Sequence, residues 1–81
     1  MTPDLIDATY IKDFVIRVKF ADGTEGEVDL EDDLQGEIFA PLKDKTYFQK
    51  FIIHPELYVL TWPNGADIAP EHLYEKVKIP A

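Results

Sequence analysis

The chain has 81 residues, of which 46% are hydrophobic and 12% aromatic, a composition typical of a folded domain rather than of a disordered segment. It contains no cysteine, which excludes disulfide frameworks, cysteine-based zinc sites and thiol nucleophiles. Sixteen acidic residues against eight basic ones give a formal net charge of −8, which argues against direct binding of DNA or RNA, because that contact requires a basic surface.

The length leaves room for one domain, so residues 1–81 are expected to form a single α+β unit. No apolar run approaches the roughly 18 residues of a membrane span. The N-terminal residues have neither the basic patch nor the apolar segment of a secretory signal. A small domain without disulfides or an export signal is expected in the cytoplasm.

Residues 14–20 are predicted to form a strand, because apolar and polar side chains alternate along them with the two-residue period of a half-buried strand. Residues 21–23 follow with turn chemistry, in which Gly23 suits the left-handed backbone of a bulged turn. The inward positions of the strand and of the return strand are Phe14, Ile16, Val18, Phe20, Gly26, Val28 and Leu30. We expect a hairpin here, joined by an earlier strand near residues 6–11.

From residue 31 to residue 42 the alternation ends, and Gly36 and Pro41 break any long helix. The apolar side chains of this stretch are predicted to anchor an irregular loop to the core, and they are Leu34, Phe39 and Leu42. Asp44 suits the N-cap of a short helix that ends near Gln49. Another strand is predicted near residues 51–54, with Phe51 and Ile53 on one face.

A second hairpin is predicted around residues 63–65, where proline, asparagine and glycine suit successive turn positions. The strand before this turn alternates at Tyr58, Leu60 and Trp62. The segments FADGTEGEVDL and WPNGADI have aromatic, Asp or Asn, and glycine residues in the same order, which we attribute to the same bulged turn in both hairpins. Pro70 suits the first position of a C-terminal helix whose Leu73 and Val77 face the sheet.

These elements predict an α+β fold: a small antiparallel sheet built from two hairpins plus an N-terminal strand, with two short helices packed on one face.

The stretch from residue 22 to residue 37 carries many acidic residues and no lysine or arginine. Such a stretch is either solvated surface or a dock for a basic partner protein. The candidate partner-binding residues are Asp22, Glu25, Glu27, Asp29, Glu31, Asp32, Asp33 and Glu37.

Catalytic chemistry has few candidates. There is no serine or cysteine, and the threonines and tyrosines stand in no nucleophile motif. The glycines form no phosphate-binding loop, and His54 and His72 lack the spacing of a metal site. A calcium loop read from Asp29 fails, because Leu34 and Ala40 stand where glycine and glutamate are needed. We expect neither enzymatic activity nor a metal or cofactor.

Trp62, Asp67 and His72 are the remaining candidates for a ligand contact, and a small-molecule sensor is the alternative function that they suggest. The structural alternative places Trp62 in the core and lets Asp67 accept hydrogen bonds from the turn or from the amides at the helix start.

Four segments taken together resemble a known bacterial family. They are FVIRVKFADG, VDL, FAPLKDKTYFQKF and LTWPNGADIAPEHLY, within about residues 6–74. The most specific is the last, which carries the pattern W-x-N-G-x-D-[IL]-x-P-x-x-L-Y from Trp62 to Tyr74. In these segments the chain resembles the family named domain of unknown function 2442.

The resemblance implies a small α+β domain, found alone or attached to a helix-turn-helix DNA-binding domain, with no established catalytic residues. It also implies that many members are encoded beside another small protein, in an arrangement that looks like a toxin–antitoxin pair. The present sequence has no helix-turn-helix segment and agrees with the stand-alone members. We therefore expect a protein-interaction domain, with an antitoxin-like role as the finer hypothesis, and the sequence leaves self-association through a strand edge open.

Overall fold

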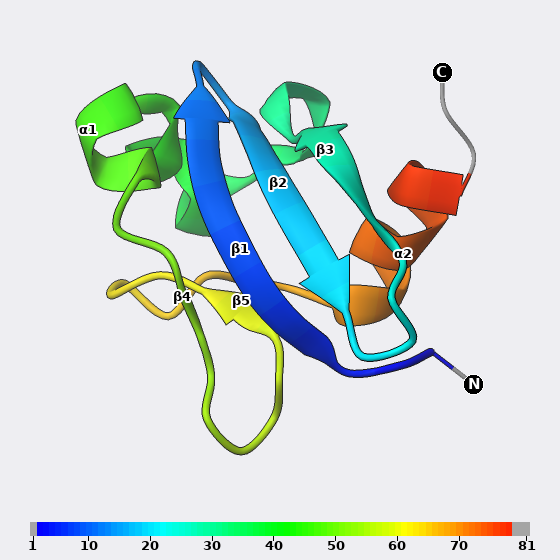
Figure 1. Ribbon diagram of the computed structural model, residues 1–81. Helices are drawn as coiled ribbons and strands as arrows, with labels where there is room; N and C mark the ends of the chain where they lie inside the picture. Colours follow the sequence, from blue (N-terminus) through cyan, green and yellow to red (C-terminus); the bar gives the residue numbers. More distant parts are fainter. Residues whose placement is uncertain (1, 79–81) are drawn as a thin grey trace.

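The computed structural model describes residues 2–78, and within them the strands form two antiparallel three-stranded sheets, ordered β1-β2-β3 and β4-β5-β6. The first sheet contains β1 (Leu5–Lys12), β2 (Val15–Phe20) and β3 (Glu25–Asp29), and the second contains β4 (Ile52–Ile53), β5 (Leu60–Thr61) and β6 (Asp67–Ile68). The 3-10 helices η1 (Glu31–Asp33) and η2 (Glu37–Lys43) and helix α1 (Lys45–Phe48) connect the sheets, and helix α2 (Pro70–Lys78) follows β6 (Figure 1).

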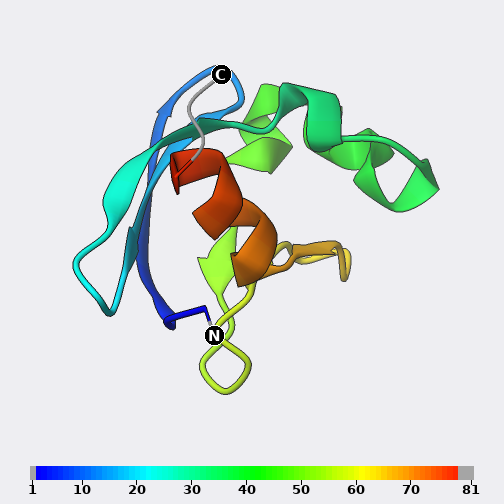
Figure 2. The same ribbon diagram turned by 90° about the vertical axis from the view of Figure 1, so that its right-hand side faces the viewer.

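The first sheet has one covered face and one uncovered face. Figure 2 shows it at the left, with α2, the 3-10 turns and the second sheet all on its right-hand side. The buried side chains of β2 and β3 point to the covered face, and they are Ile16, Val18, Phe20 and Val28. The predicted alternation is thus confirmed. The predicted N-terminal strand is also confirmed, since β1 pairs with β2 from Leu5 opposite Phe20 to Lys12 opposite Val15.

The two hairpin turns are built alike. In the first, the N–H of Phe20 donates to the carbonyl oxygen four residues later at 2.8 Å, and the N–H of Gly23 donates to the carbonyl of Phe20 at 3.0 Å. Trp62 and Gly65 make the same two bonds in the second turn, at 2.9 and 3.0 Å. Both glycines have positive φ, 90° and 91°, a conformation that other residues adopt with strain. The shared bulged turn predicted from the sequence is confirmed.

The connection between the sheets follows its predicted anchors. Leu34 and Leu42 are fully buried, and Phe39 packs half-buried against the core. Asp44 caps α1, because its Oδ1 accepts the N–H of Thr46 at 2.9 Å. This cap is the predicted one, and the irregular loop consists of two 3-10 helices.

The core is formed jointly by both sheets and the helices. Its buried residues form one cluster, which contains Leu5, Ile16, Val18, Phe20, Val28, Leu30, Leu34, Leu42, Phe48, Leu60, Trp62, Ala66, Ile68 and Leu73. Helix α2 lies close beneath β3, since a Cβ on Gly26 would stand 3.2 Å from Cγ1 of Val77. The predicted inward positions of α2 are confirmed, with Leu73 buried and Val77 packed on the core.

The α+β class, the two hairpins and the N-terminal strand are confirmed, but the strands are divided between two sheets. The prediction for Tyr58 is wrong. Tyr58 is 41% exposed with a φ of 56°, and β5 begins only at Leu60. The cause is local: the carbonyl of His54 accepts the N–H of Tyr58 at 2.9 Å, so Tyr58 closes a turn instead of extending the strand.

Candidate functional site

We name residues 22–37 the acidic segment. It runs from the first hairpin turn through β3 and η1 to the start of η2. All the predicted partner-binding residues lie on it, and the structure divides them into two groups. Some carboxylates hold elements of the fold together, and others extend into solvent.

Asp33 is the most deeply placed carboxylate of the acidic segment, with a side chain 22% exposed. Its Oδ1 lies 2.6 Å from Nε2 of His72, and its Oδ2 accepts a hydrogen bond from Nζ of Lys76 at 2.9 Å. Partial burial raises the pKa of Asp33, but the hydrogen bonds from Lys76 and His72 outweigh it and leave that pKa below its ordinary value. Asp33 therefore ties η1 to α2.

Asp22 connects the first hairpin to α2. Its Oδ1 accepts the N–H of Thr24 at 2.9 Å, and its Oδ2 accepts the hydroxyl of Tyr74 at 2.8 Å. The hydrogen bond from the Thr24 amide, followed by that from Tyr74, lowers the pKa of Asp22 below its ordinary value. Like Asp33, this carboxylate has a structural role.

Two more carboxylates of the acidic segment make local contacts. Oδ1 of Asp29 accepts the N–H of Glu31 at 2.9 Å, at the start of η1. Oε1 of Glu25 lies 3.1 Å from Nη2 of Arg17, in an exposed ion pair across the first sheet. Exposed pairs of this kind contribute little to stability, about 0–1 kcal/mol.

Four carboxylates of the acidic segment are exposed and form neither an ion pair nor a side-chain hydrogen bond with any residue from 2 to 78: Glu27, Glu31, Asp32 and Glu37. They are the carboxylates of this segment that the fold does not use. The sequence could not separate them from Asp22 and Asp33, because the partners of those two lie 52 and 39 residues away.

The uncovered face of the first sheet carries charges in rows across the strands. Asp7 lies opposite Lys19, and Lys19 lies opposite Glu25. In the next row, Arg17 lies opposite Glu27. All five side chains are exposed. In the first row the sign of the charge alternates from strand to strand, and both rows end with a carboxylate on β3.

Trp62, Asp67 and His72 share no hydrogen-bond partner within residues 2–78. The Trp62 indole is 3% exposed and donates its Nε1–H to the carbonyl of Phe48 at 2.8 Å. His72 is directed to Asp33. Asp67 is exposed on β6, and its carboxylate accepts no hydrogen bond within residues 2–78, so its predicted bonds to the turn or to the helix start are not formed. His54 caps its own loop, with Nδ1 accepting the N–H of Glu56 at 3.1 Å.

Two hollows of about 400 Å³ each open beside Phe14 and Glu31, which line both. Lys45 reaches the first from α1, and its Nζ donates to Oδ1 of Asp13 at 3.0 Å. This hydrogen bond and the charge of Lys45 lower the pKa of Asp13, and Asp13 in turn raises the pKa of Lys45. Sequence analysis missed this pair. The available signal was an aspartate between two strands, because Asp tolerates the left-handed backbone found there, with φ of 44°.

No three histidine, aspartate or glutamate side chains within residues 2–78 gather in a way that could hold a metal ion. Nor does any helix there have the length and apolar character needed to cross a membrane.

Comparison with known proteins gives one family. The model of the family described as Protein of unknown function (DUF2442) matches residues 5–78, nearly the whole chain. The chain belongs to the DUF2442 family. No curated protein and no solved structure matches this DUF2442 protein significantly. The family resemblance stated from the sequence is therefore confirmed, and the family description assigns no activity.

Proposed function

We propose that this DUF2442 protein is a non-enzymatic protein-interaction domain whose acidic segment binds a positively charged partner protein. The supporting observation is the division within that segment. Asp22 and Asp33 are occupied in holding the fold, whereas four exposed carboxylates have no such role. Exposed charges of one sign attract a complementary surface, speed its association and disfavour partners of the wrong sign.

The finer proposal is an antitoxin-like role in a two-protein module. It rests on the resemblance to the stand-alone members of the family, many of which are encoded beside another small protein. The net charge of −8 agrees with a basic partner. On this proposal the protein forms a complex with its neighbour and acts through that complex in the cytoplasm.

The test is co-expression with the protein encoded by the adjacent gene, followed by gel filtration. We expect one peak that contains both proteins and shifts toward the separate components as salt is raised, because screening weakens attraction between exposed charges. Separate elution of the two proteins at low salt would contradict the proposal.

A matched pair of variants connects the complex to the acidic segment. The first variant neutralises three of its exposed carboxylates, in Glu31→Gln, Asp32→Asn and Glu37→Gln. The second neutralises three exposed carboxylates elsewhere, in Glu56→Gln, Glu71→Gln and Glu75→Gln. Both change the net charge equally. We expect the first to weaken the complex about tenfold and the second to have a much smaller effect, because attraction between nearby charges exceeds that of the overall field.

The alternative is a small-molecule sensor near Trp62, Asp67 and His72. It has less support, since the Trp62 indole is buried and hydrogen-bonded, and His72 is paired with Asp33. A ligand screen by thermal shift, with Asp67→Asn as the control variant, would favour the sensor if a ligand stabilised the wild type alone.

A further inference from the structure

Strand β3 has a hydrogen-bonding edge that the described part of the chain leaves open. The even-numbered residues on either side of β3, Thr24 and Leu30, bond to the segment of β2. The carbonyl of Thr24 accepts the N–H of Phe20, and the N–H of Leu30 donates to the carbonyl of Phe14. In an antiparallel ladder successive residues point their backbone groups to opposite sides. The backbone groups of Glu25, Glu27 and Asp29 therefore point away from β2.

β3 is the last strand of its sheet, and none of residues 2–78 pairs with these outward groups. Figure 2 looks onto this edge, and α2 lies beside the strand, against its covered face, rather than over the edge. An open edge of this kind is a template for another strand.

We propose that the edge of β3 binds an extended, positively charged segment of a partner protein, which adds a fourth strand to the first sheet. The observation that supports this proposal is the row of backbone donors and acceptors on β3 that no residue from 2 to 78 pairs with. The side chains of the same three residues then determine which strand fits. This inference rests on the proposed function and names the mode of binding.

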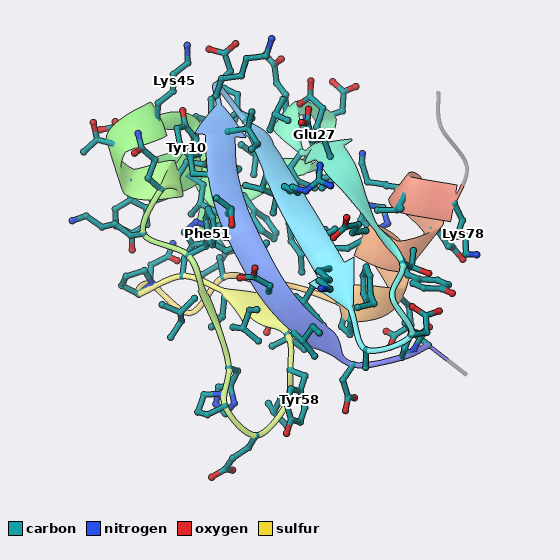
Figure 3. All side chains as sticks on the ribbon, viewed as in Figure 1. Tyr10, Glu27, Lys45, Phe51, Tyr58 and Lys78 are labelled. Carbon is teal, nitrogen blue, oxygen red and sulfur yellow. The ribbon has the colours of Figure 1, made fainter. Side chains whose placement is uncertain are left out.

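The charge rows of the sheet favour a basic strand. Across the uncovered face the signs run negative, positive, negative from Asp7 through Lys19 to Glu25. Figure 3 labels Glu27 on β3, in the neighbouring row. A strand added beyond β3 would place its side chains directly opposite these carboxylates, where opposite charges stabilise and like charges destabilise the pair. Lysine or arginine at alternate positions continues the pattern.

The same carboxylates disfavour pairing of β3 with β3 of a second copy of this chain. A two-fold dimer through β3 would pair outward-facing residues with outward-facing residues. Glu27 would lie opposite Glu27, and Glu25 opposite Asp29, with carboxylates also facing each other in shifted registers. The edge is thus selective: it repels its own copies and accepts a strand of opposite charge.

The other side chains of the added strand would point toward the covered face. There they would extend the apolar layer of Val28 and lie near Val77 of α2, which reaches the inner side of Gly26. The fitting segment therefore alternates basic with apolar residues. It binds as strands do in β-augmentation, with affinity from the main chain and specificity from alternate side chains.

The test uses the full chain and a seven-residue peptide of alternating lysine and valine, capped at both ends. Amide hydrogen exchange is followed by NMR. We expect the peptide to slow exchange of the amides of Glu25, Glu27 and Asp29 at least about tenfold, because new hydrogen bonds protect them. A control peptide with the same side chains but alternate N-methylated amides keeps the charge and loses the hydrogen bonds.

The control peptide is expected to give no such protection. Binding of both peptides without protection of these amides would overturn the inference, because it would show attraction by charge alone. Absence of any binding by the lysine–valine peptide would also overturn it. If the co-expressed complex forms but leaves these amides unprotected, the proposed function stands and strand addition fails.

A pair of charge reversals provides an independent readout. Glu27→Lys should weaken binding of the lysine–valine peptide at least about tenfold, because it places like charges opposite each other. Glu71→Lys changes the net charge equally from the exposed side of α2 and should change binding much less. Equal effects of the two variants would contradict a site at β3.

Discussion

Asp22 and Asn64 hold equivalent positions in the two hairpin turns. The Oδ1 atom of each accepts an N–H two residues later, at 2.9 Å for Asp22 and 3.1 Å for Asn64. The second polar atom of each then ties its turn to a distant part of the chain. Oδ2 of Asp22 accepts the hydroxyl of Tyr74, and Nδ2 of Asn64 donates to the carbonyl of Ile38 at 2.8 Å. One turn design thus anchors both hairpins.

The roles of these two residues differ in the direction of the second hydrogen bond, so exchanging acid and amide should have unequal effects. Asn64→Asp should lower the free energy of unfolding by about 1 kcal/mol, because a carboxylate cannot donate to the Ile38 carbonyl. Asp22→Asn should have a smaller effect, since Nδ2 of an asparagine can donate to the Tyr74 hydroxyl oxygen and so keep that hydrogen bond in the reverse direction. Urea unfolding of the two variants measures this, and equal losses would contradict the assigned directions.

Trp62→Phe should destabilise the core. It removes the donor to the Phe48 carbonyl and leaves that buried acceptor unsatisfied, a change that costs about 1–3 kcal/mol before any loss of packing. The measurement is urea unfolding followed by circular dichroism. Tyr58→Phe is the control, because this exposed ring should change stability by less than about 0.5 kcal/mol. A neutral result for Trp62→Phe would show that the hydrogen bond is unimportant.

Asp33 should make stability depend on pH in the acid range. The pKa of Asp33 is lower in the folded protein than in the unfolded chain. As the pH falls toward the ordinary aspartate pKa, the unfolded chain therefore binds a proton at Asp33 before the folded protein does. The stability it provides is fully present above the ordinary aspartate pKa of about 3.9 and is lost as the pH falls through the lowered folded value. Asp33→Asn should therefore be less stable than wild type at pH 6, and the difference should shrink below about pH 4.

The matched control is Asp32→Asn, since Asp32 is exposed and forms no ion pair within residues 2–78. Thermal unfolding at a series of pH values should show a constant, small difference for this control. A gap between wild type and Asp33→Asn that is independent of pH would contradict the assignment.

Neutralising the edge of β3 should promote self-association. The variant Glu25→Gln, Glu27→Gln and Asp29→Asn removes the repulsion between copies and keeps the open backbone groups. We expect a higher sedimentation coefficient than for the Glu56, Glu71 and Glu75 variant described above, which carries the same net charge. Identical sedimentation of both would show that charge on β3 does not control pairing of copies.

Local chemistry made much of this fold predictable. The alternation in β2, the cap at Asp44 and the glycines at 23 and 65 depend on residues within a few positions of one another, so their pattern is visible in the sequence. Tyr58 fitted an alternating pattern equally well, but its N–H donates to the carbonyl of His54 in a turn, and β5 begins only at Leu60.

The candidate site was predictable only in part. The acidic segment is visible as a run of charge, but its division depends on where α2 docks. Asp33 meets Lys76 across 43 residues of sequence, and such contacts follow from the packing of whole elements rather than from local pattern. The open edge of β3 likewise depends on strand order, which alternation alone does not define.

Trp62 is the single tryptophan of the chain, and its indole lies in the interior. Its fluorescence is therefore an intrinsic optical reporter of the core: emission should shift to longer wavelength when water reaches the ring. Partner binding at the edge of β3 leaves the indole buried and should not change that spectrum, so one unlabelled sample distinguishes loss of structure from loss of association.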